Sequence, residues 1–407
     1  MRAILIDVIE PATSKEKAEK RLEELRSLMS TYGGLSPVSI IQKKSHPDYE
    51  TYIGKGKVEE IAALAEQHEA NILIVNNLLK PRQIYNLNEA LKDQKIETWD
   101  RVDLILKIFS KHAQTSEAQL QIELASIRHM GPRIFDMGRE LMQQGGAVGL
   151  RSGQGETNIE MMKRHLKTHE LSIKKKLAHY DQVRAGHREQ RRRKGLKTAA
   201  LVGYTNAGKS ALLNALTNKG AYSANELFAT LDTRIGKLYI PAAAREDGQY
   251  QPGQEVLISD TIGFIQDLPP ELIQAFKSTL AETVEADLLL HVIDMADPEI
   301  HEKIQVVEDI LSDLGLADKP QIYIFNKLDL IAHQNVFAAP PEETPKYSLM
   351  KAGPETAISL GWIDHEIKNK KARAHMLALA KKYATKNPLF ISAVSGLGIE
   401  KLVGELG

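Results

Sequence analysis

The 407-residue chain contains no cysteine, and its 53 lysines and arginines balance 53 aspartates and glutamates. Without cysteine it can form no disulfide bond, use no thiolate in catalysis and build no cysteine-ligated zinc site. No apolar run approaches the roughly 20 residues that cross a membrane, and Asp7 interrupts the apolar N-terminus too early for a signal peptide. We therefore expect a cytoplasmic protein that does not insert into membranes.

The zero net charge conceals a strongly basic segment. Between Lys163 and Lys197 the chain has 13 lysines and arginines but only three acidic residues, so this segment carries +10 and the rest of the chain −10. Such asymmetry is common in proteins that contact nucleic acids. Taken alone, the run is equally compatible with a solvated coiled coil.

The length and ordinary composition, with 43% hydrophobic and 26% charged residues, predict two or three domains. The first, residues 1–113, alternates short apolar runs with helical patterns, which predicts a parallel α/β domain. Thr13 and Glu16 form a candidate capping box for its first helix, which is expected to run to about Met29. Residues 54–57, Gly-Lys-Gly-Lys, favour a turn into a helix over a second phosphate site. The other elements predicted here are strands at 4–6, 38–41 and 71–75, and helices at 57–68 and after Pro81.

Residues 114–195 are expected to form a long antiparallel helical hairpin. Leu120, Leu124 and Ile127 suit one face of a first helix that ends by Gly131-Pro132. A glycine-rich stretch at 145–157 would form the tip of the hairpin and leave the basic residues on its solvent side.

The second helix of the hairpin is expected to start near Ile159, where apolar residues begin to recur at seven-residue intervals, the pattern of a coiled-coil seam. His165 and His169 have metal-ligand spacing, but a solvated basic face is the favoured interpretation. The predicted seam consists of Ile159, Met162, Leu166, Ile173, Leu177, Tyr180 and Val183.

Residues 196–407 are expected to form a doubly wound P-loop domain. An apolar strand at 198–202 leads into Gly203-Tyr-Thr-Asn-Ala-Gly-Lys-Ser210, and a helical pattern follows. In such a loop, backbone N–H groups surround the β-phosphate, Lys209 reaches the β- and γ-phosphates, and the Ser210 hydroxyl binds magnesium. The nucleotide contacts predicted here are Gly203, Asn206, Ala207, Gly208, Lys209 and Ser210.

Downstream residues complete the predicted phosphate site. Asp260, at the end of an apolar strand, is placed to hold magnesium through water, and the Gly263 N–H to contact the γ-phosphate. Phe228 and Thr230 lie in the candidate first switch, where Thr230 would join the magnesium shell only when a γ-phosphate is present. An ordinary strand threonine is the alternative for Thr230. The catalytic candidates are Lys209, Thr230 and Gly263.

The sequence Asn-Lys-Leu-Asp at 326–329 predicts guanine as the base. Its aspartate can accept hydrogen bonds from both the N1–H and the 2-amino group of guanine, whereas adenine lacks that amine. A site whose polar groups stay unpaired with the wrong base discriminates strongly. The backbone N–H groups of residues 392 and 393 are expected at guanine O6, although 62 residues, including an insertion at about 331–368, intervene. The base-binding residues predicted here are Asn326, Lys327, Asp329, Ser392 and Ala393.

Four stretches of the chain resemble the HflX family of GTPases: 51–61, 119–124, 153–160 and 227–232. The resemblance covers nearly the whole chain. It implies a GTPase that binds the large ribosomal subunit and separates ribosomes into subunits, with the helical hairpin reaching into ribosomal RNA. The RNA contacts implied are Arg151, Lys163, Arg164 and Lys167, and we expect the protein to be a monomer.

Two residues bear on catalysis. Phe264 stands where many GTPases have a glutamine that orients the attacking water, so hydrolysis should be slow until the ribosome assists. Asn206 matches an asparagine that coordinates potassium in related GTPases, which makes potassium a candidate cation beside magnesium. An ordinary loop asparagine explains Asn206 equally well.

The alternative function is an RNA-binding ribosome-assembly module in which the nucleotide is a slow structural switch.

Overall fold

The computed structural model describes residues 1–144, 152–217, 234–244, 250–261, 263–265, 280–333 and 370–406. Two compact units divide the chain, one consisting of Met1–Arg184 and the other beginning at Ala185. In the described part, no helix is both long enough and apolar enough to cross a membrane. Arg151, Phe228, Thr230 and most of the expected insertion lie outside the described residues.

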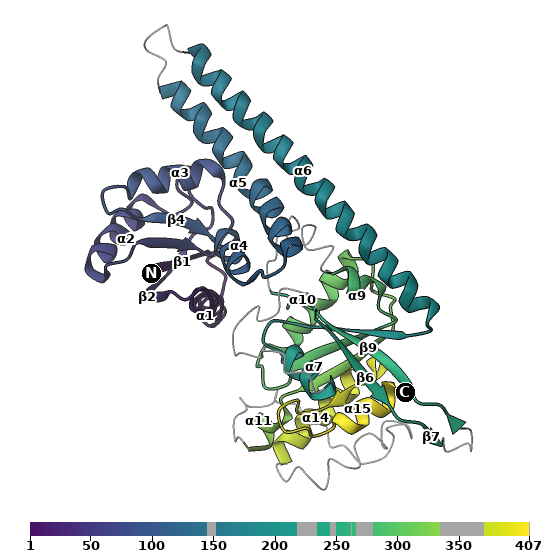
Figure 1. The fold of residues 1–407 in the computed structure, drawn as a ribbon. Coiled ribbons are helices and arrows are strands. Elements are labelled where there is room, and N and C mark those ends of the chain that lie inside the picture. Colours follow the sequence, from purple (N-terminus) through teal and green to yellow (C-terminus); the bar gives the residue numbers. More distant parts are fainter. Residues whose placement is uncertain are drawn as a thin grey trace. The chain divides into compact units, whose positions relative to one another are not determined.

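The N-terminal sheet has four parallel strands in the order β2-β1-β3-β4 (Figure 1). Ile4, Ile6 and Val8 of β1 point into a hydrophobic cluster with residues of α2 and α3, while α1 contacts β1 and α4. The parallel α/β arrangement expected here is confirmed. The elements are β1 (Arg2–Ile9), α1 (Lys15–Tyr32), β2 (Leu35–Lys43), α2 (Lys55–His68), β3 (Ile72–Val75), α3 (Pro81–Ala90), β4 (Glu97–Asp100) and α4 (Arg101–His112).

Two local features of this domain concern helix starts. The N-cap of α1 is Ser14, whose side chain accepts a hydrogen bond from the Lys17 N–H at 3.2 Å, so the Thr13 capping box is wrong. Both residues suit a cap, but the Thr13 N–H closes a turn to the Glu10 carbonyl, which leaves Ser14 as the residue next to the helix. Gly54 is the N-cap of α2, so residues 54–57 lead into a helix as expected, and the helix begins at Lys55.

The middle of the chain forms two long helices, α5 (Ser116–Gln144) and α6 (Ser152–Arg193). The expected end of the first helix at Gly131-Pro132 is wrong, because α5 continues for another 12 residues beyond Pro132. A proline removes one helical hydrogen bond but has a helix-compatible φ, so a long helix can continue through it despite the preceding glycine. The second helix begins at Ser152, before the expected start near Ile159.

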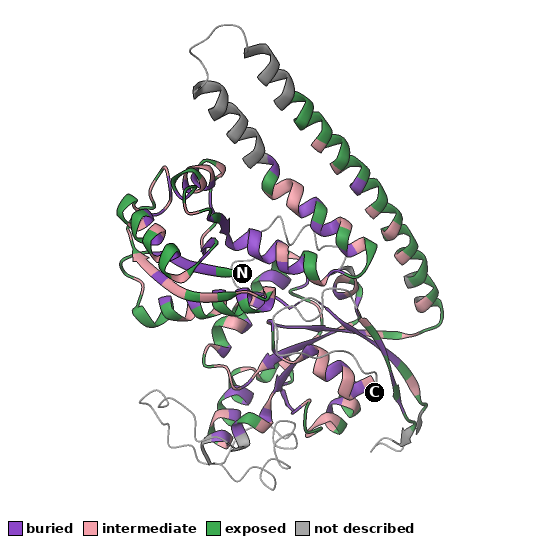
Figure 2. Ribbon diagram, turned by 60° about the vertical axis from the view of Figure 1, so that its left-hand side comes forward, coloured by how far each residue is buried: buried purple, intermediate pink, exposed green. Residues whose placement is uncertain are grey.

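The less exposed residues of α6 recur at intervals of three and four, which is the period of a coiled-coil seam. Ile173 is buried, but Met162 and Val183 are 46% and 45% exposed, so their placement in the seam is wrong. The residue that follows Tyr180 in the seam is Arg184, whose guanidinium binds Glu117 of α5. Most of the described surface of α6 is exposed (Figure 2).

The C-terminal sheet has six strands in the order β12-β11-β10-β5-β9-β6, parallel except for β6, which pairs antiparallel with β9. Its strands are β5 (Lys197–Val202), β6 (Arg234–Ile240), β9 (Gln254–Asp260), β10 (Leu288–Asp294), β11 (Gln321–Asn326) and β12 (Leu389–Phe390). A separate small pair consists of β7 (Ala243–Ala244) and β8 (Tyr250–Gln251).

Helices cover both faces of this sheet. One hydrophobic cluster contains apolar residues of α7 and α15. A second contains residues of α10 and α14, and a third contains further residues of α10. Because β9 and β10 lie on opposite sides of β5, the carboxyl end of β5 is a topological switch point, where ligands bind in open α/β sheets. The helices are α7 (Lys209–Thr217), α9 (Ala281–Glu285), α10 (Ile300–Asp313), α11 (Leu328–His333), α14 (Lys370–Lys382) and α15 (Ile399–Leu406).

Candidate nucleotide-binding site

The loop after β5 has the geometry of a phosphate-binding loop. Gly203 has φ +149°, and a Cβ built there would lie 2.2 Å from the Val292 carbonyl oxygen. Gly208 has φ +96°, and its Cβ would lie 2.2 Å from Asn326 Nδ2. Only glycine fits both positions, so the loop can pass close to β10 and β11 and then enter α7.

Lys209, the first residue of α7, is buried, and its Nζ donates to the carbonyl oxygens of Gly203 at 3.1 Å and Tyr204 at 2.9 Å. Burial lowers the pKa of Lys209 to about 8, and the nearby carboxylate of Asp260 opposes this shift. The loop therefore holds the ammonium group along its own backbone, where it can face the phosphates.

Ser210 and Asp260 meet at the N-terminus of α7. The Ser210 hydroxyl donates to Asp260 Oδ2 at 2.6 Å, and Asp260, the last residue of β9, is fully buried. Magnesium prefers hard oxygen ligands and is usually bound by one or two carboxylates, together with waters and phosphates. A hydroxyl and a carboxylate that converge beside the phosphate loop fit that requirement.

Gly263 lies against the phosphate loop. A Cβ on Gly263 would be 2.9 Å from Lys209 Nζ and 2.8 Å from Thr205 Cγ2, so a side chain here would displace the lysine or the loop. The Phe264 N–H donates to the Gly203 carbonyl at 3.1 Å, and the Thr205 N–H donates to the Phe264 carbonyl at 2.8 Å. The Phe264 side chain is only 2% exposed and packs in the cluster with Val202 and residues of α10.

Asn326 connects three segments of the site. Its Nδ2 donates to the Ala207 carbonyl at 2.9 Å, and its Oδ1 accepts from the Ala393 N–H at 2.9 Å. The next residue, Lys327, has φ +65° and forms an ion pair with Asp294 at the end of β10, at 2.7 Å. The phosphate loop and the base motif are therefore locked together by side chains.

The long separation between Asp329 and Ser392 does not keep them apart. The Ser392 hydroxyl donates to Asp329 Oδ1 at 2.6 Å, and β12 pairs in parallel with β11 just before it. The Ser392 N–H donates to the Leu397 carbonyl, and the Ala393 N–H to Asn326. Ser392 thus reaches the base site through its hydroxyl, and the Ala393 N–H would have to be shared between Asn326 and a guanine O6.

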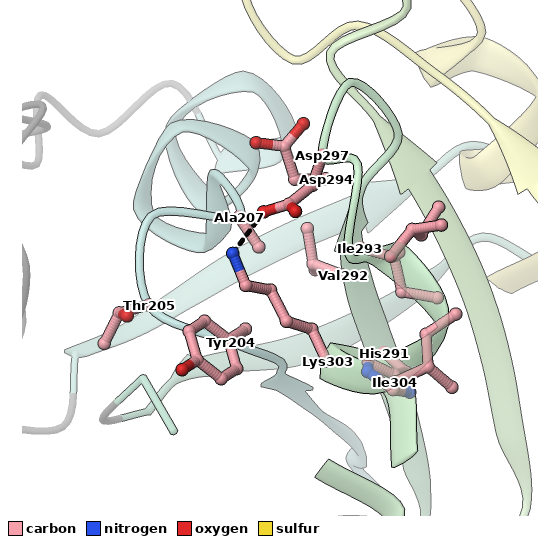
Figure 3. A pocket seen from close by; sticks show the side chains of 11 residues that line it. Tyr204, Thr205, Ala207, His291, Val292, Ile293, Asp294, Asp297, Lys303 and Ile304 are labelled. Atoms are coloured by element: carbon pink, nitrogen blue, oxygen red, sulfur yellow. Dashed lines mark hydrogen bonds and ion pairs between the residues drawn. The ribbon is translucent and has the colours of Figure 1, made fainter. Parts of the chain in front are cut away.

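A small cavity of about 20 Å³ lies between the phosphate loop and α10 (Figure 3). It is lined by Tyr204 and Thr205 of the loop, by the end of β10 and by residues of α10 that include Lys303. His291, one of the lining residues, is buried, and burial together with the charges of Lys209 and Lys386 lowers its pKa to about 3. The imidazole is therefore neutral at physiological pH.

Asp294 and His291 were missed by sequence reasoning. Asp294 is the last residue of the largely buried strand β10, and a carboxylate at the end of a parallel strand is a signal that could have identified it. His291 lies inside that strand among apolar neighbours, and nothing in the sequence marks it as close to Lys209.

Outside this site, one further group of described residues has metal-ligand side chains close together: Asp100, Asp103 and His129. Their atoms already have structural tasks, since Asp100 and Asp103 form a capping box at the start of α4 and His129 contacts both carboxylates at 3.2 and 3.4 Å. His169 contacts Glu123 of α5 at 2.7 Å, which agrees with the interpretation that it is not a metal ligand.

Family models match three consecutive segments. Residues 19–110 match the GTP-binding GTPase N-terminal model, 112–191 the GTP-binding GTPase middle region, and 198–327 the 50S ribosome-binding GTPase model. The GTPase HflX of Caldanaerobacter subterraneus is 44% identical over 330 residues, which cover 81% of this chain and 73% of the relative. The chain belongs to the HflX family of GTPases.

Other relatives agree. The GTPase HflX of Escherichia coli is 37% identical over 320 residues, covering 78% of this chain and 71% of that protein. The solved structure of SsGBP in complex with GDP has a TM-score of 0.50 and 24% identity and covers all of this chain and 97% of its own, so it has the same fold. As a member of the HflX family with a P-loop GTPase domain, this chain binds and hydrolyses GTP.

Proposed function

We propose that this HflX-family GTPase is a cytoplasmic monomer that binds the RNA of the large ribosomal subunit and promotes the separation of ribosomal subunits. The observation that carries the proposal is the exposed basic surface of α6, the helix that precedes the GTPase domain in the sequence. The 50S ribosome-binding GTPase model that matches residues 198–327 supports the same partner.

The proposed domains are an α/β domain at 1–113, a hairpin of α5 and α6 at 114–195 and the GTPase domain at 196–407. Three contacts support the hairpin: the ion pairs of Arg184 with Glu117 and of Arg128 with Glu170, and the hydrogen bond between His169 and Glu123. Glu117 near the start of α5 meets Arg184 near the end of α6, whereas Glu123 and Arg128, further along α5, meet residues nearer the middle of α6, which is the pattern of antiparallel helices.

The basic face of α6 is suited to the phosphate backbone of RNA. Lys163, Arg164 and Lys167 are all exposed, and Lys174, Lys175 and Lys176 continue the same charge along the helix. Each cation that neutralises a phosphate releases counterions, so the affinity should fall steeply with salt. Arg151 is proposed as a further contact because it adjoins the start of α6.

In the nucleotide site we propose the roles that the sequence predicted. Gly203, Ala207, Gly208, Lys209 and the Gly263 N–H bind the phosphates, and Ser210 and Asp260 hold magnesium, the latter through water. Magnesium would neutralise charge on the phosphates during hydrolysis. Phe228 and Thr230 would respond to the γ-phosphate, and Asp329 would read the guanine edge with Ala393 at O6.

We propose that intrinsic hydrolysis is slow and that the large subunit accelerates it. Phe264 offers no hydrogen-bonding group to an attacking water, and its ring is buried in a hydrophobic cluster. A partner must therefore supply the missing orientation of the water. Single-turnover hydrolysis should rise when purified large subunits are added, and an unchanged rate would contradict this role.

Potassium is proposed as a second cation at Asn206. This residue is exposed in the phosphate loop and has φ +61°, so its backbone turns the loop while its side chain faces outward. Turnover should be faster in potassium than in sodium at equal ionic strength, and Asn206→Ala should remove the difference. Equal rates in both salts would leave Asn206 as a loop residue only.

Co-sedimentation tests the proposed function directly. The protein should pellet with large subunits in the presence of a GTP analogue and much less with GDP or without nucleotide. Substitution of Lys163, Arg164 and Lys167 by glutamine should abolish pelleting, whereas the same change at three exposed lysines elsewhere, Lys15, Lys92 and Lys237, should not. Binding that ignores the nucleotide would favour the ribosome-assembly alternative instead.

A further inference from the structure

Asp294 ends β10 at a position directly beside the guanine motif. In the parallel pairing of β10 with β11 it lies in register with Asn326, and the Met295 N–H donates to the Asn326 carbonyl at 3.1 Å. Both oxygens of its carboxylate are used. Oδ1 accepts from the Ala296 N–H at 3.0 Å, and Oδ2 accepts from Lys327 Nζ at 2.7 Å.

The side chain of Lys327 ends at this contact. Its backbone is left-handed with φ +65°, and its side chain, 19% exposed, extends from the end of β11 to the end of β10. A free lysine side chain carries about 2 kcal/mol of rotamer entropy and would sample many positions. The Asp294 carboxylate, 22% exposed, selects one of them.

The position of Lys327 relative to its neighbours indicates what its stem contacts. Asn326 is tied to the phosphate loop at Ala207, and Asp329 is tied to Ser392 on the opposite side. A guanine whose edge meets Asp329 and whose phosphates meet the loop must therefore lie alongside residue 327. The four-carbon stem is the apolar surface available to the purine ring there.

We propose that Asp294 is a positioning residue for the nucleotide: its carboxylate holds Lys327 so that the stem forms a fixed floor under the purine ring. Asp294 contributes to affinity for purine nucleotides in general. Base discrimination belongs to Asp329, which reads the edge of the ring. The role rests on GTP binding and is independent of any ribosomal partner.

Asp297, in the same turn, provides a matched control (Figure 3). Its Oδ1 accepts from the Glu299 N–H at 2.8 Å, and its Oδ2 forms an ion pair with Lys303 of α10. It therefore supports the turn and the start of α10 without touching Lys327. A purely structural role for the turn would make Asp294 and Asp297 equivalent.

A double-mutant cycle with fluorescent GDP tests the proposal. Asp294→Ala should raise the Kd for GDP about fivefold, as expected for a partly exposed ion pair, and Asp297→Ala should change it less than twofold. Lys327→Met keeps the stem but loses the ammonium group, so adding Asp294→Ala to it should have no further effect. Additive effects of the two substitutions, or equal losses from Asp294→Ala and Asp297→Ala, would overturn the proposal.

Specificity gives a second readout, which separates the role of Asp294 from that of Asp329. Inosine diphosphate lacks the 2-amino group, so the ratio of its Kd to that of GDP reports on Asp329. That ratio should be unchanged in Asp294→Ala, while both Kd values rise together. Asp294→Asn retains an acceptor for Lys327 and should recover part of the affinity, which also controls for misfolding. A changed ratio, or no recovery in the asparagine variant at unchanged thermal stability, would refute the role.

Discussion

Cationic side chains occupy two contrasting environments in this chain. In the nucleotide site, Lys209 is buried, donates to two carbonyl oxygens and has a pKa lowered to about 8 by burial. On α6, Lys163, Arg164 and Lys167 are exposed. A buried cation acts in one fixed geometry, whereas exposed cations act through the summed field of the surface and are screened by salt.

The difference determines how each region reads its ligand. The nucleotide site is connected through side chains, since Asn326 binds Ala207 and Ala393 while Ser392 binds Asp329. Loss of one member should therefore disturb several others. The cations of α6 that pair with a neighbour do so locally, as Lys174 does with Glu170 one turn away at 2.7 Å, so their contributions should be more nearly independent.

The largest effect is expected from Lys209→Met. Removing the buried ammonium group should weaken GTP binding by about 100-fold or more, because charge-assisted contacts to phosphate are lost where water cannot replace them. RNA binding measured without nucleotide should be unchanged. Fluorescent nucleotide titration measures the affinity for GTP, and filter binding measures the affinity for RNA. A loss of RNA affinity in this variant would show that the two regions do not act separately.

His291 should make the buried region sensitive to acid. Its pKa is lowered from 6.5 to about 3 in the folded protein, first by burial and then by Lys209 and Lys386. Below pH 6.5 the unfolded chain binds a proton that the folded chain does not, so stability that is complete above pH 6.5 is lost as pH falls toward 3. At pH 5 the loss is about 2 kcal/mol.

Urea unfolding of His291→Phe and of wild type at pH 7 and pH 5 measures this difference. The substitution keeps an aromatic ring against Tyr323, whose centroid lies 4.7 Å away, and should remove the loss. His179→Gln, a change at an exposed histidine of α6, should leave the loss in place. Equal acid sensitivity of His291→Phe and wild type would contradict the assigned pKa shift.

Single charge removals on α6 should have smaller and additive effects. Each of Lys174→Gln, Lys175→Gln and Lys176→Gln is expected to weaken RNA binding a few-fold if it contacts a phosphate, and to reduce the slope of log K against log salt by about 0.9. Titrations at several salt concentrations measure both quantities. A single variant that abolishes binding at all salt concentrations would indicate a specific pocket.

The smallest expected effect is a proton taken up on nucleotide binding. At pH 9 Lys209 of the free protein is mostly neutral because its pKa is lowered to about 8, and the phosphates should recharge it. Calorimetry in two buffers of different ionisation enthalpy should therefore show uptake approaching one proton. Lys209→Arg, which stays charged, should show none, and GDP affinity of wild type should decline above pH 8.

The nucleotide site was largely predictable because its chemistry is local. The glycines of the phosphate loop, Lys209 and Ser210 are consecutive or nearly so, and Asp260 and Asn326 end apolar strands that must be buried. Parallel strands bring such ends to one edge of a sheet. Sequence order therefore predicts proximity here, although Ser392 lies 63 positions beyond Asp329.

The less predictable features are those for which two neighbouring residues suit the same structural position about equally well. Thr13 and Ser14 are both good N-caps, and Val183 and Arg184 both fit a helical period, but only Arg184 meets an acidic partner on α5. The continuation of α5 through Pro132 and the hydrogen bonds of the Ser392 and Ala393 N–H groups likewise depend on neighbours that are distant in the sequence.

By itself, the sequence determined the ligand class and the division of labour: a phosphate loop, a guanine motif and a basic helix, each read from residues close together along the chain. Only the tertiary structure decided which side chains hold these parts in place. Asp294, His291 and Phe264 acquire their roles from strands that are adjacent in space, because burial and hydrogen-bond partnership are properties of the packed sheet and not of the local sequence.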